Sequence, residues 1–209
     1  MAELVRFYFD PICPWCYQTS RWAMRLAELG EIQLSWGLFS LEVQNAGREP
    51  EDMASSHARS ARGLRTAVLV RDQAEAAAGA FYAALGRRVH EEGQDLDAAE
   101  TVEAALRDAG LDAALCDKAW SDPSTQERVA SEHRALCDRT RSFGVPTIVL
   151  DGGDGPAIFG PVISEVPDDD AAVELWRHVR WLTRYDNFAE LKRDRTSLPD
   201  LESVRRSRR

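Results

Sequence analysis

The chain has 209 residues, of which 44% are hydrophobic and 29% are charged, and its formal net charge at pH 7 is −9. A chain of this length can bury a full core as one domain, or as one domain with a sizeable insertion. The negative charge argues against nucleic acid as the main partner, and no stretch is long and apolar enough to span a bilayer. Nucleic-acid-binding and membrane-spanning classes are therefore disfavoured.

The first predicted elements are a strand and a helix that flank a Cys-X-X-Cys motif. Residues 4–9 are apolar and aromatic, as in a strand, and the apolar spacing from Trp22 to Leu29, ended by Gly30, is typical of a helix. The motif Cys13-Pro14-Trp15-Cys16 therefore lies on the first turn of a helix. Free N–H groups and the positive helix end favour a thiolate there, so we expect a lowered pKa for Cys13.

The two cysteines of the motif predict a redox pair. Cys13 is nearest the helix start and is the expected nucleophile, whereas Cys16, one turn later, is placed to attack a mixed disulfide on Cys13 and release the product. Pro14 suits an early helix position because its missing N–H is not needed there. Trp15 offers a large apolar surface beside the sulfur.

No metal site is predicted, because no second Cys-X-X-Cys or Cys-X-X-His follows the motif. Cys116 and Cys137 stand alone within helical patterns and are interpreted as buried small hydrophobes, with an accessory redox pair as the alternative. The four histidines are scattered without metal-ligand spacing. Of these, His90 is the candidate for contact with the cysteine site.

The middle of the chain predicts one more strand and then a helical block. Residues 32–39 alternate like a strand, and the short connection makes a βαβ unit with two parallel, neighbouring strands. Residues 44–56 are expected to form a loop. From about residue 60 to 140 the composition favours helices. The expected helices are 64–89, 98–109, 111–120 and 124–140, with Asp97 and Asp122 as N-caps.

The last third of the chain predicts a hairpin and a closing helix. A strand pattern over residues 145–150, a Gly-rich turn and a short run over 156–159 indicate an antiparallel hairpin. Asp168-Asp169-Asp170 then precede an amphipathic helical pattern. A polar tail begins at about Phe188, and its basic end is expected to be solvated and disordered. The basic residues of that end are Arg205, Arg206, Arg208 and Arg209.

The order of these elements resembles the DsbA-like branch of the thioredoxin superfamily over about residues 4–186. The shared features are Cys-Pro-Trp-Cys at the turn of the βαβ unit, a helical insertion, and Gly-Val-Pro-Thr at the start of the hairpin. The resemblance implies an α/β thioredoxin fold with a helical insertion domain between the βαβ unit and a C-terminal ββα unit. The expected parts are residues 1–56 and 143–187 for the thioredoxin fold, 57–142 for the insertion, and 188–209 for the tail.

The same resemblance implies a role for the hairpin start. In this fold the bond before the proline that matches Pro146 is cis, and that proline lies against the active-site cysteines. The backbone of Val145 is then expected to pair with an extended substrate beside Cys13.

Several longer blocks are similar to the actinobacterial mycothiol-dependent reductases. These blocks are residues 7–16, 19–22, 81–86, 159–164 and 190–193. The similarity implies a thiol-disulfide oxidoreductase that mycothiol reduces, that acts on disulfides or small electrophiles such as nitroaromatic compounds, and that needs no tightly bound cofactor. The expected partners are a low-molecular-weight thiol and a small-molecule or disulfide substrate. Phe159, Gly160 and Pro161 are expected to contact that substrate, although a hairpin edge packed on the last helix is the alternative.

The N-terminus shows no secretory pattern, so a cytoplasmic protein is expected, in which a cysteine pair works as a reductant or transient carrier. Thioredoxin or glutathione in place of mycothiol remains open. A second interpretation is an enzyme like kappa-class glutathione transferases or 2-hydroxychromene-2-carboxylate isomerases, which use this scaffold to activate a bound thiol without a redox cycle. Those sites generally carry a single Ser or Cys at the helix start, so the complete motif favours redox chemistry.

Overall fold

The computed structural model describes residues 2–48 and 50–208, so Met1, Glu49 and Arg209 lie outside the described residues. Its strands form one mixed sheet in the order β2-β1-β3-β4. β1 runs parallel to β2, and β3 runs antiparallel to both β1 and β4. The predicted parallel pair and the predicted hairpin are therefore confirmed. The strands are β1 Glu3–Phe9, β2 Ile32–Leu38, β3 Thr147–Leu150 and β4 Ala157–Phe159.

Helix α1, Pro14–Glu28, connects β1 to β2, and most other helices lie between β2 and β3 in the sequence. Gly30 follows α1 with φ +77°, as expected for a glycine that ends a helix. The helices after β2 are α2 Leu41–Asn45, α3 Glu51–Ala58, α4 Ala61–Gln73, α5 Ala77–Gly86, the π-helix η1 Arg87–Glu91, α6 Ala99–Asp108, α7 Leu115–Ser121 and α8 Pro123–Thr140. After β3 follow the 3-10 turn η2 Asp151–Gly153, α9 Asp169–Arg184 and α10 Glu202–Arg206.

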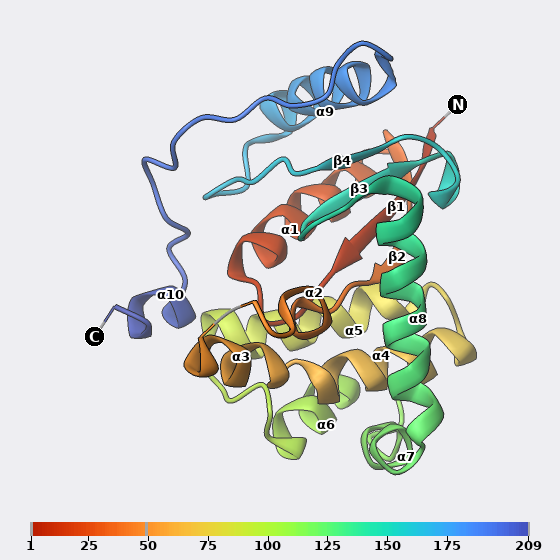
Figure 1. The fold of residues 1–209 in the computed structure, drawn as a ribbon, viewed down its shortest axis with the longest axis vertical. Helices are drawn as coiled ribbons and strands as arrows, with labels where there is room; N and C mark the ends of the chain where they lie inside the picture. The colour runs from red at the N-terminus through yellow and green to blue at the C-terminus, as the bar shows by residue number, and fades with distance from the viewer. Residues whose placement is uncertain (1, 49, 209) are drawn as a thin grey trace.

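The sheet lies between α9 and the helical block (Figure 1), in which α3 to α7 gather below the sheet and α9 lies above it. Helices α1 and α9 pack through Trp22 and Trp176, whose ring centroids are 6.2 Å apart. On the other side, Phe9 of β1 stacks on Tyr82 of α5 at 3.9 Å. The fold is thus the predicted DsbA-like α/β thioredoxin fold, and its helical block is joined to the strand that leads into the cysteine motif.

Two predictions for the middle of the chain, one loop and one helix, are wrong. Residues 44–56 are not a loop, because α2 and α3 occupy most of them; Ser40 caps α2 by accepting the N–H of Val43, and Pro50 directly precedes α3. The predicted helix 64–89 is divided into α4, α5 and η1, with Ala74 in an extended conformation between the first two. Alanine-rich sequence favours helix throughout, so nothing local marks that break.

Of the two predicted N-caps, Asp122 is confirmed and Asp97 is wrong. Asp122 caps α8 by accepting the N–H of Ser124, and Pro123 is the first helical residue, as predicted. Asp97 does not cap α6, since the N-cap is Ala98 and no side chain bonds to that helix end.

The C-terminal segment, residues 188–208, does not run out into solvent. Pro199 and Leu201 are buried, and α10 packs against η1. Arg205, Arg206 and Arg208 are exposed, as predicted, but Arg206 also donates to the carbonyl oxygen of Gly93 at 2.6 Å. Only two apolar side chains anchor this segment, which is too few for a helical pattern in the sequence. Within residues 2–48 and 50–208, no helix combines the length and apolar character that crossing a bilayer requires.

Candidate active site

Cys13 is the N-cap of α1, and Pro14 is the first residue of that helix. The Cys13 backbone is extended, and its Sγ accepts the N–H of Cys16 at 3.4 Å. The thiol is half-buried and donates to the carbonyl oxygen of Val145 at 3.9 Å. The predicted position of the motif at the helix start is confirmed, and the side chain that leads the motif faces the hairpin start.

Cys16 lies one turn later and is fully buried. Its Sγ donates to the carbonyl oxygen of Tyr8 at 3.8 Å. The buried hydroxyl of Tyr82 also lies beside this sulfur, and within residues 2–48 and 50–208 no atom meets the hydrogen-bond distance and angle limits for it. Burial, together with the neighbouring Cys13, raises the pKa of Cys16 well above its ordinary value. Cys16 is therefore a protonated, water-excluded thiol at rest.

Burial also raises the pKa of Cys13, to about 11. The N–H groups of Cys16 and Trp15 lower this pKa, as does the charge of Arg195, while the charge of Asp10 raises it further. The lowered pKa expected from the helix start is therefore wrong for the reduced protein. The helix donors are present, but the loss of water around the sulfur outweighs them.

Asp10 is a fully buried carboxylate three residues before Cys13. It accepts the N–H groups of Ile12 at 3.0 Å and Leu41 at 2.8 Å, and the hydroxyl of Ser60 at 3.3 Å. Burial raises the pKa of Asp10 to about 6. This side chain ties the motif loop to α2 and α4. Its position before a proline in the turn was the only signal for it in the sequence.

The hairpin start meets the motif as the family resemblance implies. The Val145–Pro146 bond is cis, and so is the Gly160–Pro161 bond, which was not predicted. Gly160 donates its N–H to the Pro146 carbonyl oxygen at 2.8 Å, and its φ of +96° suits glycine. Thr19 of α1 donates to the Pro161 carbonyl oxygen at 2.9 Å. Residues 159–161 are thereby joined to both the hairpin start and the motif helix.

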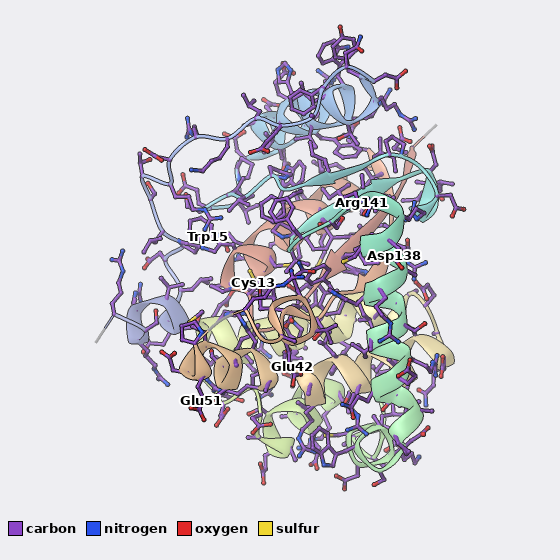
Figure 2. The ribbon with its side chains drawn as sticks, in the orientation of Figure 1. Cys13, Trp15, Glu42, Glu51, Asp138 and Arg141 are labelled. Carbon is purple, nitrogen blue, oxygen red and sulfur yellow. The ribbon has the colours of Figure 1, made fainter. Side chains whose placement is uncertain are left out.

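Aromatic side chains lie on both the cysteine motif and the hairpin. Trp15 is half-buried, and the guanidinium of Arg195 lies 4.9 Å from its ring centroid. Phe159 is half-buried and pairs with the exposed ring of Phe143, with centroids 4.8 Å apart. Figure 2 shows Cys13 and Trp15 on one face of the molecule. Sequence reasoning missed Phe143 and Arg195, because single side chains in irregular segments form no pattern.

His90 contacts the loop before the motif and not the sulfurs. Its Nε2 lies 2.9 Å from the carbonyl oxygen of Pro11, and its Nδ1 lies 2.9 Å from the hydroxyl of Ser203. Since a carbonyl only accepts, Nε2 carries the proton and Nδ1 accepts from Ser203. Burial lowers the pKa of His90 to about 4, so the ring is neutral at pH 7. The predicted contact with the site region is thus found, through a main-chain carbonyl.

The other two cysteines, Cys116 and Cys137, contact different residues. Cys116 is fully buried, and its Sγ contacts the carbonyl oxygen of Ala99 at 3.9 Å. Cys137 is half-buried beside His133 of the same helix. In the described part of the chain, no group of three or more His, Cys, Asp or Glu side chains could hold a metal ion.

Comparison with known proteins places the chain in a family. Residues 12–193 match the Rv2466c-like family model, described as mycothiol-dependent nitroreductase Rv2466c. A relative, the uncharacterized protein Rv2286c of Mycobacterium tuberculosis (strain ATCC 25618 / H37Rv), is 35% identical over 204 residues, which are 96% of this chain and 85% of the relative.

Solved structures support the fold. The cytosolic disulfide reductase DsbM from Pseudomonas aeruginosa with GSH has a TM-score of 0.60 and 18% identity, over 84% of this chain and 98% of that one. A 2-hydroxychromene-2-carboxylate isomerase has a TM-score of 0.59 and 21% identity, over 86% and 96% of the two chains. At these identities the likeness concerns the fold alone. With the family match over most of the chain, the protein belongs to the Rv2466c-like family and is an oxidoreductase with the DsbA-like thioredoxin fold.

Proposed function

We propose that the protein is a cytoplasmic thiol-disulfide oxidoreductase in which Cys13 attacks, Cys16 resolves and mycothiol restores the dithiol. The observation that carries the proposal is the pair itself: a half-buried thiol at the helix start, with a fully buried thiol one turn behind it. The half-buried first thiol is open to an incoming disulfide, whereas burial shields the second from it. The family match supports mycothiol as the reductant.

The proposed reaction moves two electrons from the cysteine pair to the substrate. The Cys13 thiol loses its proton and attacks one sulfur of the substrate disulfide, so a mixed disulfide forms and the first substrate thiolate leaves and takes up a proton. Cys16 then loses its proton and attacks Cys13 Sγ, which forms the Cys13–Cys16 disulfide and releases the second substrate thiol. Two mycothiol molecules reduce the protein disulfide and become mycothiol disulfide.

The raised pKa of both cysteines supports reduction as the direction of the reaction. A dithiol oxidant such as DsbA is strongly oxidising because its reduced form is stabilised. Here burial destabilises the thiolate of the reduced form. The reduced state therefore lacks the stabilisation that a strong oxidant needs, and the Cys13–Cys16 dithiol is suited to act as a reductant.

The proposed substrate surface surrounds Cys13. The carbonyl oxygen of Val145 contacts the Cys13 thiol, so this main-chain group lies beside the sulfur that a substrate would reach. The rings of Trp15 and Phe159 offer apolar area for the body of a small electrophile such as a nitroaromatic compound. The full proposed surface is Pro14, Trp15, Val145, Pro146, Phe159, Gly160 and Pro161.

The fold likeness to a 2-hydroxychromene-2-carboxylate isomerase favours a second candidate, an enzyme that activates a bound thiol without a redox cycle. In that case Cys16 would have no chemical task. The fully buried Cys16 behind Cys13 supports the redox candidate, because a resolving thiol is what a redox cycle adds to this scaffold.

The deciding test is NADPH consumption when the protein and a small disulfide substrate are coupled to mycothiol and its reductase. The glutathione and thioredoxin systems run beside it, and Cys13→Ser serves as the blank. Turnover with mycothiol alone supports the proposal, and turnover only with another system contradicts mycothiol as the reductant. Cys16→Ser is expected to accumulate a mixed disulfide on Cys13, visible by mass spectrometry. Normal turnover of Cys16→Ser with a disulfide substrate would contradict the two-cysteine mechanism.

A further inference from the structure

The C-terminal segment brings a cation to the cysteine motif. The guanidinium carbon of Arg195 lies 4.9 Å from the ring centroid of Trp15, which is two residues from Cys13. A guanidinium over an indole face is held there by cation–π attraction. Its charge also reaches the reactive sulfur, since it lowers the pKa of Cys13. A residue outside the thioredoxin fold therefore acts on the chemical centre.

The position of this segment is held by contacts to the helical block. Ser203 bonds to His90, which also bonds to the Pro11 carbonyl oxygen in the motif loop. Arg206 donates to the Gly93 carbonyl oxygen at 2.6 Å, and Leu201 is buried. One neutral imidazole thus joins the C-terminal segment to the loop that precedes Cys13.

The segment also forms an open pocket of about 440 Å³ with a cationic lining, made by residues 195–208. Three arginines line it, Arg195, Arg205 and Arg208, and the nearby acid Asp200 is paired with Arg205. Across the described residues, neither Arg195 nor Arg208 has a carboxylate within ion-pair distance. The hydroxyls of Thr196 and Ser197 add donors to the lining. This local positive charge contrasts with the net charge of −9 for the whole chain.

We propose that this pocket is a subsite for the anionic part of the substrate that reacts at Cys13, a carboxylate-bearing disulfide or electrophile. The inference rests on the proposed function only in taking Cys13 as the attacking thiol. A guanidinium presents a fork of donors that matches a carboxylate, and Arg195 is already oriented by Trp15. The volume suits a small molecule, not a folded partner. Arg195 is the lining residue that contacts the motif, so an anion held by its guanidinium would lie beside Trp15.

The test compares two alkylating reagents that differ in charge, iodoacetate and iodoacetamide. Each transfers its carbon to the Cys13 sulfur and releases iodide, so no mycothiol or second substrate is needed. The rate at Cys13 is followed by peptide mass spectrometry on the reduced full chain at low salt. Iodoacetamide reports the reactivity of the thiolate, and the ratio of the iodoacetate rate to the iodoacetamide rate reports attraction of the anion.

Arg195→Gln is expected to lower this rate ratio by about threefold or more, the size expected for one cation a few ångströms from a charged ligand near the protein surface. Arg193→Gln is the matched control, because Arg193 is an exposed arginine of the same segment outside the pocket lining. Ser203→Ala, which removes the bond to His90, is expected to lower the ratio in the same direction and less. High salt is expected to reduce the ratio of the unchanged protein.

Two results would overturn the subsite. One is a ratio that Arg195→Gln leaves unchanged, or that Arg193→Gln lowers equally. The other is an equal slowing of both reagents in Arg195→Gln, which would mean that Arg195 acts on the thiolate and not on the ligand. Failure of the proposed function looks different, because Cys13 would then not be the preferentially alkylated cysteine with either reagent.

Discussion

The motif region and helix α8 each contain a cysteine and a buried histidine, and the two regions differ in what the histidine contacts. On α8, Cys137 Sγ lies 3.7 Å from His133 Nε2 and 3.6 Å from the amide oxygen of Gln44. At the motif, His90 reaches a main-chain carbonyl oxygen and no sulfur. A search for Cys-His contacts would select the wrong region.

The hydrogen bonds of His133 explain why Cys137 is not activated. The N–H of Ser40 points at His133 Nδ1 at 3.4 Å, so Nε2 carries the proton and faces the Cys137 sulfur as a donor. That imidazole has no free lone pair with which to take the thiol proton. Burial raises the pKa of Cys137, which lies inside a helix and away from free N–H groups. A helix start and a second thiol one turn later distinguish Cys13, rather than a neighbouring histidine.

The largest expected effect is the contrast between two serine substitutions. Cys13→Ser is expected to remove turnover by about a thousandfold or more, because a hydroxyl is a far weaker nucleophile than a thiolate and cannot form the disulfide. Cys137→Ser is expected to stay within about twofold of the unchanged protein, since no step uses this thiol. Both are measured in the coupled disulfide-reduction assay. A tenfold loss in Cys137→Ser would remove the distinction between the two regions.

The pH dependence of stability sharpens the difference between the two histidines. The pKa of folded His90 is about 4, below its ordinary value of 6.5, so the unfolded chain binds an extra proton between these pH values. The contribution of His90 to the free energy of unfolding is therefore fully present above pH 6.5. It is lost as the pH falls to 4, and the total loss is about 3 kcal/mol. The stability advantage of the unchanged protein over His90→Gln should therefore shrink by about that amount on acidification, as measured by urea unfolding.

The matched control is His133→Gln. Burial also lowers the pKa of His133, so its effect has the same sign. Asp10 acts in the opposite sense, because its folded pKa of about 6 lies above the model-peptide value of 3.8, so that it adds stability as pH falls between these values. Asp10 is present in every variant, so its effect cancels in the stability difference between the unchanged protein and that variant. A gap between the unchanged protein and His90→Gln that is constant with pH would mean that His90 is not buried and neutral in solution.

The parts of the site that local sequence determines were predictable. The motif, Pro14 at the first helical position and the hairpin follow from short-range patterns, and the cis bond before Pro146 follows from the family resemblance. Each depends on residues within about one helix turn or one strand of the feature itself. The proposed roles of these residues in substrate binding remain predictions.

The parts that depend on distant segments were not predictable. The raised pKa of Cys13 is the sum of burial by several elements and the charge of Asp10, which no local pattern reports. Asp10 itself becomes a buried acceptor only because α2 and α4 supply donors from residues 41 and 60. The contact of Arg195 with Trp15 spans 180 positions of sequence and has no periodic signature.

The smallest expected effect concerns the buried hydroxyl of Tyr82 beside Cys16. Among the described residues, no group meets the hydrogen-bond distance and angle limits for this hydroxyl, although Cys16 and Ser20 lie beside it, and a buried polar group without a good hydrogen bond costs about 1–3 kcal/mol. Tyr82→Phe keeps the ring stacked on Phe9 and removes that cost, so the free energy of unfolding is expected to rise by about 1 kcal/mol. The same change removes a hydroxyl that lowers the pKa of Cys16 and so favours the thiolate that forms during resolution.

Tyr82→Phe is therefore expected to be more stable and yet slower, with the resolving step reduced by about tenfold if one hydrogen bond to a charged sulfur is lost. An aromatic disulfide such as Ellman's reagent separates the steps, because the first thiolate leaves when Cys13 attacks and the second leaves when Cys16 resolves. Only the second phase should slow. Tyr17→Phe is the control, since that hydroxyl bonds to Glu91 at 2.7 Å and not to a sulfur. A loss of stability in Tyr82→Phe would show that the Tyr82 hydroxyl is hydrogen-bonded in the resting protein. The position of Cys16 behind Cys13 would then be the feature that distinguishes Cys16 from Cys137.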